Sequence, residues 1–287
     1  MTNTLPKISI VTPSYNQGRF IERTITSVIE QNYPNLEYIV MDGGSTDGTV
    51  DLLRKYQRHL DFWTSAPDAG QADAISQGFA RASGDILAWL NSDDFYESGV
   101  LQQVAELFGQ WPDVDVISGR CRLWYGDQRD RMMGPSPLRS FEDFLKIKSN
   151  LLSGRSIIQP EAFFRRRAFD KAGGLHRELH YCFDQCLWMD MAKSGCKFES
   201  VDRHWANLRM HESQKTWDQF GGSVELARVA WNQLRENWGR LANPVEIADD
   251  IFSVLEQLAV REQKVSASLR DSTSYRLGRM LTKRKFW

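Results

Sequence analysis

The sequence lacks the features that mark several specialised classes of protein. It has four cysteines in 287 residues, and its 36 basic side chains nearly balance its 37 acidic ones. Near-neutral charge argues against broad nucleic-acid binding, which needs a basic face, so we expect no nucleic-acid partner. The cysteines are too few and too irregularly spaced for a disulfide framework, which favours a reducing, intracellular setting.

Long apolar runs and a secretory leader are missing as well. The densest apolar run, Ile86 to Leu90, has five residues, whereas a membrane-spanning helix needs about 20. The first residues, Met1 to Lys7, lack the charged and apolar regions of a secretory signal. These absences predict a cytoplasmic protein. We find no internal repeat and no low-complexity linker.

The fingerprints of two large nucleotide-binding classes are also absent. A dinucleotide-binding enzyme needs G-x-G-x-x-G directly after its first strand, where this chain reads TPSYNQG. The phosphate-binding motif G-x-x-x-x-G-K-[ST] does not occur in the sequence. The chain therefore fits neither a nicotinamide dehydrogenase nor a P-loop enzyme.

The first hundred residues alternate between strand and helix patterns. Short apolar runs predict strands at Ile8–Val11, Leu36–Met41, Leu60–Thr64 and Ile86–Leu90. Helical spacing predicts helices at Ile21–Ile29, after an Asp47 cap, and at Gln71–Ala82. Continuously apolar strands separated by helices indicate a parallel sheet covered on both faces. The first part of the chain is thus predicted to be a doubly wound α/β unit.

The pattern loosens beyond Ser98. The sequence predicts strands at Val114–Ile117, Arg120–Tyr125 and Arg203–His211, an extended segment at Gln159-Pro160, and a helix at Cys182–Lys193. From Phe220 onward we expect two long helices, separated by Asn243-Pro244.

Polar residues follow three of the predicted strands, where a ligand crevice is expected. They are Thr12 to Tyr15, Asp42 to Gly44, and Asn91 to Asp94. Adjacent carboxylates such as Asp93 and Asp94 indicate a divalent cation, Mg²⁺ or Mn²⁺, because their mutual repulsion needs compensation. The alternative is that Ser92 or Asp93 caps the next helix. Asp42 can accept the ring N–H of a pyrimidine, with the Thr12 hydroxyl nearby.

Two segments carry a family resemblance: ISIVTPSYNQGRFIERTITSVIEQNYPNLEYIVMDGGSTDGTVDLLRKY and ASGDILAWLNSDD. They closely resemble the family 2 glycosyltransferases of the GT-A fold and span nearly all of the first hundred residues. The resemblance implies a Rossmann-like α/β domain with a mixed central sheet. It also implies transfer of a sugar from a nucleotide-sugar, usually UDP-linked, with inversion at the anomeric carbon. One departure is Asn91, where many members have an aspartate.

The resemblance also implies roles for individual residues. The nucleotide-binding residues would be Thr12, Pro13, Tyr15, Asp42, Asp68, Gln71 and Asp93. The metal ligands would be Asp94 and His211, holding Mn²⁺ or Mg²⁺, although a lone histidine is commonly structural. In LHYCFDQCLWMDMAKSG, Asp184 takes the place of the catalytic base, with a helix cap as the alternative. Gln159 and Glu161 would line the acceptor pocket, although packing roles fit them equally well.

A second metal site can be imagined around three cysteines and two histidines. They are Cys182, Cys186, Cys196, His176 and His180. Their spacing fits no standard zinc pattern, so the sequence favours core cysteines over a zinc site.

The predicted layout has two parts. A catalytic domain would span 1–215, with a nucleotide-binding half at 1–97 and an acceptor-binding half at 98–215; a helical extension would follow at 216–287. Residues 266–287 carry a net charge of +5 against −6 for the rest. Apolar residues at helical intervals and the terminal Phe286 and Trp287 suit docking on an anionic membrane. Packing on the protein or on a second subunit, as in a homodimer, is the alternative.

The predicted reaction is metal-dependent, inverting transfer from a UDP-sugar to a saccharide or lipid-linked saccharide. A glycosyltransferase-like scaffold that binds nucleotide or glycan without turnover is the alternative function. The joint presence of Asp42, Asp94 and Asp184 speaks against that scaffold.

Overall fold

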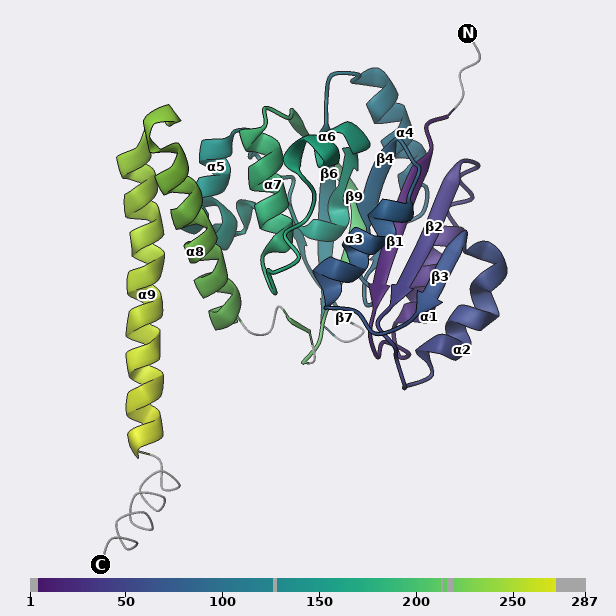
Figure 1. The fold of residues 1–287 in the computed structure, drawn as a ribbon, viewed down its shortest axis with the longest axis horizontal. Helices are drawn as coiled ribbons and strands as arrows, with labels where there is room; N and C mark the ends of the chain where they lie inside the picture. Colours follow the sequence, from purple (N-terminus) through teal and green to yellow (C-terminus); the bar gives the residue numbers. More distant parts are fainter. Residues whose placement is uncertain (1–4, 126–127, 213, 216–218, 272–287) are drawn as a thin grey trace, which may run out of the picture.

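One mixed sheet of nine strands runs through the molecule (Figure 1). The computed structural model describes residues 5–125, 128–212, 214–215 and 219–271. The strands are β1 (Ile8–Ser14), β2 (Leu36–Asp42), β3 (Phe62–Ser65), β4 (Ile86–Trp89), β5 (Phe95–Tyr96), β6 (Val116–Tyr125), β7 (Gln128–Met133), β8 (Ala162–Arg165) and β9 (Phe198–Met210). Their spatial order is β3-β2-β1-β4-β8-β6-β9-β5, with β7 beside β6.

The helices cover both faces of this sheet. They are α1 (Ile21–Ile29), α2 (Thr49–Tyr56), α3 (Gln71–Arg81), α4 (Val100–Gln110), α5 (Phe141–Leu145), α6 (Arg166–Ala172), α7 (Phe183–Lys193), α8 (Gln219–Asn237) and α9 (Pro244–Asp271), with a π-helical segment at Ile147–Arg155. Apolar residues of α1, α2 and α4 form one buried cluster, and those of α3, α5 and α7 belong to a second. Two clusters on opposite faces explain why β1 is buried along its whole length.

The sheet changes direction halfway across. Strands β3, β2, β1 and β4 are parallel, which confirms the doubly wound first part. Strand β8 then pairs antiparallel with both β4 and β6, so the sheet as a whole is mixed. The carboxyl ends of β1, β2 and β4 consequently lie at one edge, where the polar residues predicted from the sequence gather.

The C-terminal helices pack on the same core as α7. Figure 1 shows α8 and α9 side by side at the end of the molecule, next to α5 and α7. Leu226, Leu234 and Ile251 are buried in the cluster that also contains residues of α7. The two predicted long helices are therefore confirmed. Within the described residues, no helix combines the length and the apolar character needed to cross a bilayer.

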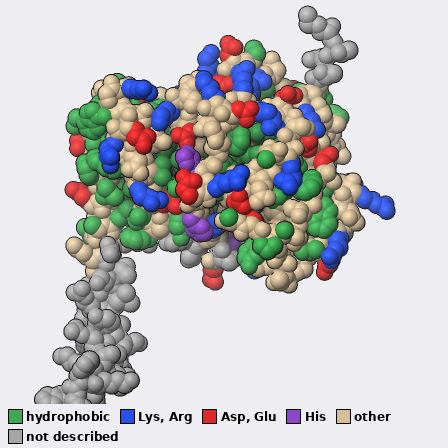
Figure 2. All heavy atoms as spheres, in the orientation of Figure 1, with side chains coloured by type: hydrophobic (Ala, Val, Ile, Leu, Met, Phe, Trp, Pro, Cys, Tyr) green, Lys and Arg blue, Asp and Glu red, His purple; other side chains and the backbone are tan. Residues whose placement is uncertain are grey.

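Both signs of charge are interspersed over the face shown in Figure 2. Hydrophobic side chains also reach the surface at the end formed by the C-terminal helices. Among the described side chains of α9, Val245, Phe252, Leu255 and Val260 are exposed.

Three details predicted from the sequence were wrong. The two strands expected on either side of Gly119 are one strand, β6, and the Trp205 ring packs so closely on this glycine that a Cβ there would lie 2.6 Å from the ring. Gln159–Glu161 forms a 3-10 turn instead of an extended segment. Helix α2 is capped by Gly48 in a left-handed conformation, and Asp47 lies one residue earlier.

Candidate active site

The edge formed by the ends of β1, β2 and β4 carries most of the predicted site residues. Parallel pairing sets Ser14 opposite Asp42 and Val11 opposite Trp89. The loops that follow these strands therefore begin side by side, as expected for the ligand crevice of an open α/β sheet.

Asp42 at the end of β2 is buried and held by its own loop. Its Oδ2 accepts hydrogen bonds from Gly44 N (3.2 Å), Ser45 N (2.9 Å) and Ser65 Oγ (2.6 Å), and its Oδ1 accepts one from Ser45 Oγ (2.5 Å). Three of these four hydrogen bonds go to Oδ2. Oδ1, which accepts one, is therefore the oxygen with room for a further donor, such as a pyrimidine N–H.

A cavity of about 210 Å³ lies beside Asp42 and is also lined by Asp68. Typical ligand pockets span roughly 300–1,000 Å³, so this one suits part of a nucleotide. Gly43 allows the two acidic residues to approach, since a Cβ at this position would lie 2.8 Å from Asp68 Oδ2. Asp68 also accepts a hydrogen bond from Gly70 N (2.8 Å), which fixes its loop at the start of α3.

The end of β1 supplies one exposed and several buried residues. Tyr15 is 64% exposed, so its ring is available for a ligand. Thr12 and Pro13 are buried, and the Thr12 hydroxyl lies 3.1 Å from the Tyr38 hydroxyl inside the sheet. The buried Ser14 hydroxyl has no hydrogen-bond partner. Sequence reasoning did not single out Ser14, which a donor or acceptor on a ligand could satisfy.

Three amide side chains connect α3, β4 and the segment before β8. Gln71 Nε2 donates to Asn91 Oδ1 (2.8 Å), and Asn91 Nδ2 donates to Gln159 Oε1 (3.0 Å). Gln159 Nε2 in turn donates to the carbonyl of Trp89 (2.7 Å). Asn91 Nδ2 also lies 3.5 Å from Asp94 Oδ2. Asn91, the residue that departs from the family pattern, thus connects Gln71 of α3 to Asp94.

Asp94 is fully enclosed, with none of its surface exposed. Its Oδ1 accepts the backbone N–H of Arg209 (3.0 Å), and the Thr24 hydroxyl donates to its carbonyl (2.6 Å). Burial, and next the charge of Asp93, raise the pKa of Asp94 well above its ordinary value. A divalent cation bound there would offset both effects, so the residues present fit Mn²⁺ or Mg²⁺.

His211 comes to the acidic pair from the end of β9. Its Nε2 lies 2.9 Å from Asp93 Oδ2, and its ring stacks on Phe20 at 4.6 Å. The capping alternative for Ser92 and Asp93 is wrong, because β5 follows them and α4 begins only after Gly99. The structure therefore pairs the His211 imidazole with Asp93, whereas the Asp94 carboxylate contacts Arg209 N and the Asn91 amide.

Asp184 lies in the first turn of α7. Cys182 is the N-cap, so Asp184 is not the cap itself. Its carboxylate accepts Gln185 N (2.8 Å) and Gln185 Nε2 (3.2 Å). The same Gln185 amide is held by Ser156 Oγ (2.7 Å), three residues before Gln159 in the chain. Burial raises the pKa of Asp184 to about 6, a value suited to a general base near neutral pH.

Glu225 of α8 completes the N-terminus of α7. Its carboxylate accepts the backbone N–H groups of His180 (2.9 Å), Tyr181 (2.7 Å) and Cys182 (2.9 Å). These bonds lower the pKa of Glu225 despite its partial burial. Because Cys182 is the N-cap of α7, one of these bonds satisfies a free N–H group at the helix start, and the other two hold the segment that leads into the helix. Sequence reasoning missed Glu225, because nothing local marks a contact across more than forty residues.

The two predicted acceptor residues are both buried. Gln159 belongs to the amide chain described above. The Glu161 side chain has no exposed surface, and its Oε1 accepts Ile158 N (3.1 Å) while Oε2 lacks a hydrogen-bond partner. Burial raises its pKa well above the ordinary value. An acceptor role for either residue stays a prediction.

The cysteines predicted as core residues are buried and free. His180 is turned toward the Tyr181 ring, at 4.6 Å. His176 and Cys186, in contrast, lie close to Asp190.

Comparison with known proteins adds a family and a set of relatives. The family model described as "Glycosyl transferase family 2" matches residues 9–173. An uncharacterised glycosyltransferase of Mycobacterium tuberculosis (strain H37Rv) is 35% identical over 191 residues, which span 63% of this chain and 66% of that protein. The putative teichuronic acid biosynthesis glycosyltransferase TuaG of Bacillus subtilis is 38% identical over 111 residues, 37% of this chain and 43% of TuaG. The matches thus cover less than two thirds of these relatives.

Solved structures show the same fold. Residues 1–349 of Staphylococcus aureus TarS, crystallised with UDP-GlcNAc, superpose with a TM-score of 0.60 at 16% identity, covering 88% of this chain and 80% of that one. The mannosyltransferase PcManGT of Pyrobaculum calidifontis, in complex with GDP-Man and Mn²⁺, gives a TM-score of 0.59 at 18% identity, covering 96% and 83%. Their mixed α/β architecture is the one described above.

Proposed function

The chain belongs to glycosyl transferase family 2, and from this premise we propose that it transfers a sugar from a UDP-sugar to a saccharide or lipid-linked saccharide. Asp42 at the end of β2 and the acidic pair after β4, on either side of β1, carry this proposal. Asp42 would hold the nucleobase, and the acidic pair would hold the diphosphate. A UDP-sugar complex of a protein with this fold supports the choice of nucleotide, and the name of TuaG supports the class of acceptor.

Each group of residues has its own task in this proposal. Asp42, Asp68 and Tyr15 bind the nucleoside, with Thr12, Pro13 and Gln71 shaping their loops. Asp93, Asp94 and His211 would hold Mn²⁺ or Mg²⁺, which neutralises charge on the diphosphate when bound. The hydrogen bonds of Asn91 to Gln71 and Asp94 would fix the position of the metal-binding residues relative to the nucleotide-binding residues.

Asp184 acts as general base. Its carboxylate takes the proton of the acceptor hydroxyl while that oxygen bonds to the anomeric carbon. The bond from this carbon to the diphosphate breaks on the opposite side, so UDP leaves and the configuration inverts. Gln185 orients the carboxylate through two hydrogen bonds, and Glu225 fixes the helix that carries it.

The test is release of UDP from a panel of nucleotide-sugars with Mn²⁺, with and without saccharide acceptors. We expect one UDP-sugar to stabilise the protein against heat and to be turned over. Binding of a nucleotide-sugar with no turnover under any acceptor would instead favour the scaffold alternative. No binding of any nucleotide-sugar would contradict both.

Replacing Asp42 by alanine is expected to weaken UDP binding by roughly 10- to 100-fold, because one charge-assisted hydrogen bond contributes roughly 1.5–3 kcal/mol. Turnover at saturating donor should change little. Calorimetric titration with UDP measures the first effect and initial rates the second. Asp42→Asn tests the charge with less disturbance of Ser45 and Ser65, and Asp51→Ala on the exposed side of α2 is the control. Unchanged UDP affinity in both Asp42 variants would refute the assignment.

The basic tail predicted at 266–287 belongs to this proposal as a membrane anchor on the inner face of the membrane. Its side chains lie outside the described residues. The exposed apolar residues Val245, Phe252, Leu255 and Val260 precede it on the same helix, α9. A lipid-linked acceptor would make such docking useful.

We expect the full chain to sediment with anionic liposomes at low salt and to be released at high salt, because each basic residue near the surface contributes about 1 kcal/mol. A chain truncated after Val265 should stay in the supernatant. Absence of binding by the full chain would leave packing on protein or a homodimer as the role of the tail, and analytical ultracentrifugation distinguishes these two.

A further inference from the structure

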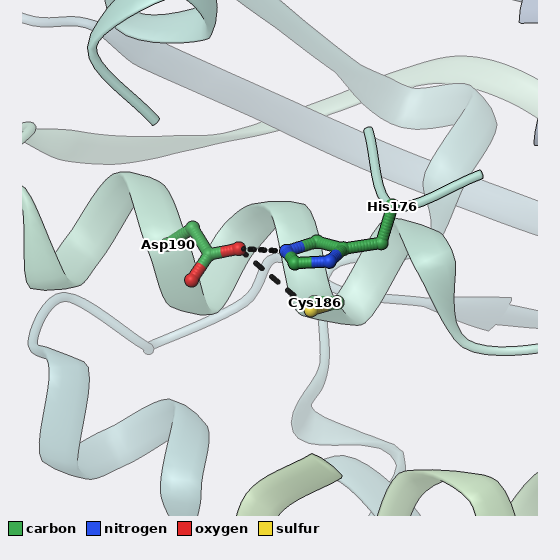
Figure 3. Close-up of side chains that lie close together, drawn as sticks. All are labelled: His176, Cys186 and Asp190. Carbon is green, nitrogen blue, oxygen red and sulfur yellow. Dashed lines mark hydrogen bonds and ion pairs between the residues drawn. The ribbon is translucent and has the colours of Figure 1, made fainter. Parts of the chain in front are cut away.

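A cluster of three metal-ligating side chains lies away from the proposed donor site. His176 comes from the segment between α6 and α7, and Cys186 and Asp190 are one turn apart on α7 (Figure 3). One donor atom from each lies within 4.8 Å of the others. Among the side chains that the structure describes, this is the one group of three histidines, cysteines or acids that converges in this way.

The separations fit a single small cation. His176 Nε2 lies 2.9 Å and Cys186 Sγ 3.7 Å from Asp190 Oδ2. Zinc binds nitrogen and oxygen at roughly 2.0–2.2 Å and sulfur at roughly 2.3 Å, so tetrahedral ligands lie roughly 3.3–3.8 Å apart. A shift of a few tenths of an ångström at the imidazole would accommodate the ion.

Further contacts orient two of these ligands as metal sites commonly do. Glu178 Oε1 lies 3.0 Å from His176 Nδ1, which leaves Nε2 to face the cluster. Gln233 Nε2 of α8 donates to Asp190 Oδ1 (3.1 Å), which leaves Oδ2 to face it. A carboxylate behind a metal-binding histidine fixes its tautomer and raises its basicity.

We propose that His176, Cys186 and Asp190 bind a zinc ion through Nε2, Sγ and Oδ2, with water as the fourth ligand. The thiolate and imidazole favour zinc over the Mg²⁺ or Mn²⁺ suited to the acidic pair. Binding releases the thiol proton and the Nε2 proton to solvent, and Zn²⁺ with one thiolate and one carboxylate is electrically neutral. Cys186 and Asp190 are buried, whereas the His176 side chain is 40% exposed, which gives the ion a path of entry.

A bound ion would connect the loop of His176 to α7, and through Gln233 to α8. The sequence disfavoured zinc because the spacing of His176 and Cys186 with His180, Cys182 and Cys196 fits no standard zinc pattern. Asp190 completes the set only once α7 has formed.

The experiment uses the full chain, stripped of metal with a chelator and titrated with Co²⁺ as the spectroscopic probe. We expect one equivalent to give thiolate-to-cobalt charge transfer and the visible bands of tetrahedral cobalt, and Zn²⁺ to abolish both. Cys186→Ser should lose the charge transfer, while Cys196→Ser, which changes another buried cysteine, should keep it. Glu178→Gln should weaken binding about 10- to 100-fold.

Two further variants test whether loss of cobalt binding reflects misfolding and whether the cobalt spectrum comes from the acidic pair. His176→Gln changes a partly exposed loop residue, so it should fold and bind Co²⁺ far more weakly. Asp94→Ala should leave the cobalt spectrum unchanged. Absence of charge transfer in the wild-type chain, or its persistence at full strength in Cys186→Ser, would overturn the zinc site.

Discussion

Asp184→Asn is expected to lower turnover by about 10²- to 10⁴-fold, which is the usual contribution of a general base. The amide keeps the shape of the side chain but cannot accept the proton of the acceptor hydroxyl. UDP affinity should stay within about twofold, because Asp184 lies on α7, outside the residues that would hold the nucleotide. Single-turnover rates and UDP titration separate the two quantities.

The pH dependence gives the same prediction a second readout. Burial raises the pKa of Asp184 to about 6, and the base works only when ionised. Wild-type kcat/KM should therefore be level above pH 6 and fall about tenfold per unit below it. In Asp184→Asn, the fall of kcat/KM below pH 6 should be absent. If this variant keeps the fall, or loses UDP affinity and turnover equally, Asp184 is not the base.

A measurement of thermal stability can exclude loss of folding as the cause of lost turnover in Asp184→Asn. Because the pKa of Asp184 is higher in the folded chain than its ordinary value of 3.8, ionisation favours the unfolded state. Stability from this group is full below the unfolded value and declines as pH rises toward 6. Asp184→Asn removes that penalty, so its thermal unfolding at pH 7 should occur at the wild-type temperature or higher.

Asp94→Ala is expected to reduce turnover by roughly 10³-fold or more, because a metal at the diphosphate supplies several kcal/mol and each 1.4 kcal/mol is about tenfold in rate. Asp94 is buried next to Asp93, with a strongly raised pKa. Removing one of two adjacent buried carboxyls should therefore preserve the fold. Excess EDTA should abolish turnover of the wild-type chain, and Mn²⁺ should restore it.

Matched variants make the metal prediction specific. Asp94→Asn keeps an oxygen for Arg209 N and should lose turnover while retaining the fold. Asp51→Ala, which removes a carboxylate on α2, should behave as wild type. Near wild-type rates in Asp94→Ala, or turnover that is insensitive to EDTA, would refute the metal assignment.

The parts of the fold that could be predicted are those encoded locally. The parallel strands from β1 to β4 are short apolar runs, and residues at their ends must share one edge, so the amino-acid pattern was enough to locate Asp42 and Asp94. Gly119 led to the prediction of a break between two strands. A glycine is needed there because the Trp205 ring packs against it, a contact that the local sequence does not show. The capping role of Glu225 and the convergence of Asp190 with His176 depend on tertiary packing, which spacing along the chain does not encode.

The hydrogen bonds of Glu225 bear on how this enzyme family can be recombined. The helix that carries Asp184 is completed by a carboxylate from α8, some forty residues further on. A chimera joined between α7 and α8 would combine the helix that carries Asp184 from one parent with the residue that holds its start from the other. Exchanges of acceptor specificity should therefore transfer α7 and α8 together. Glu225 and the N–H groups that it binds then come from the same parent.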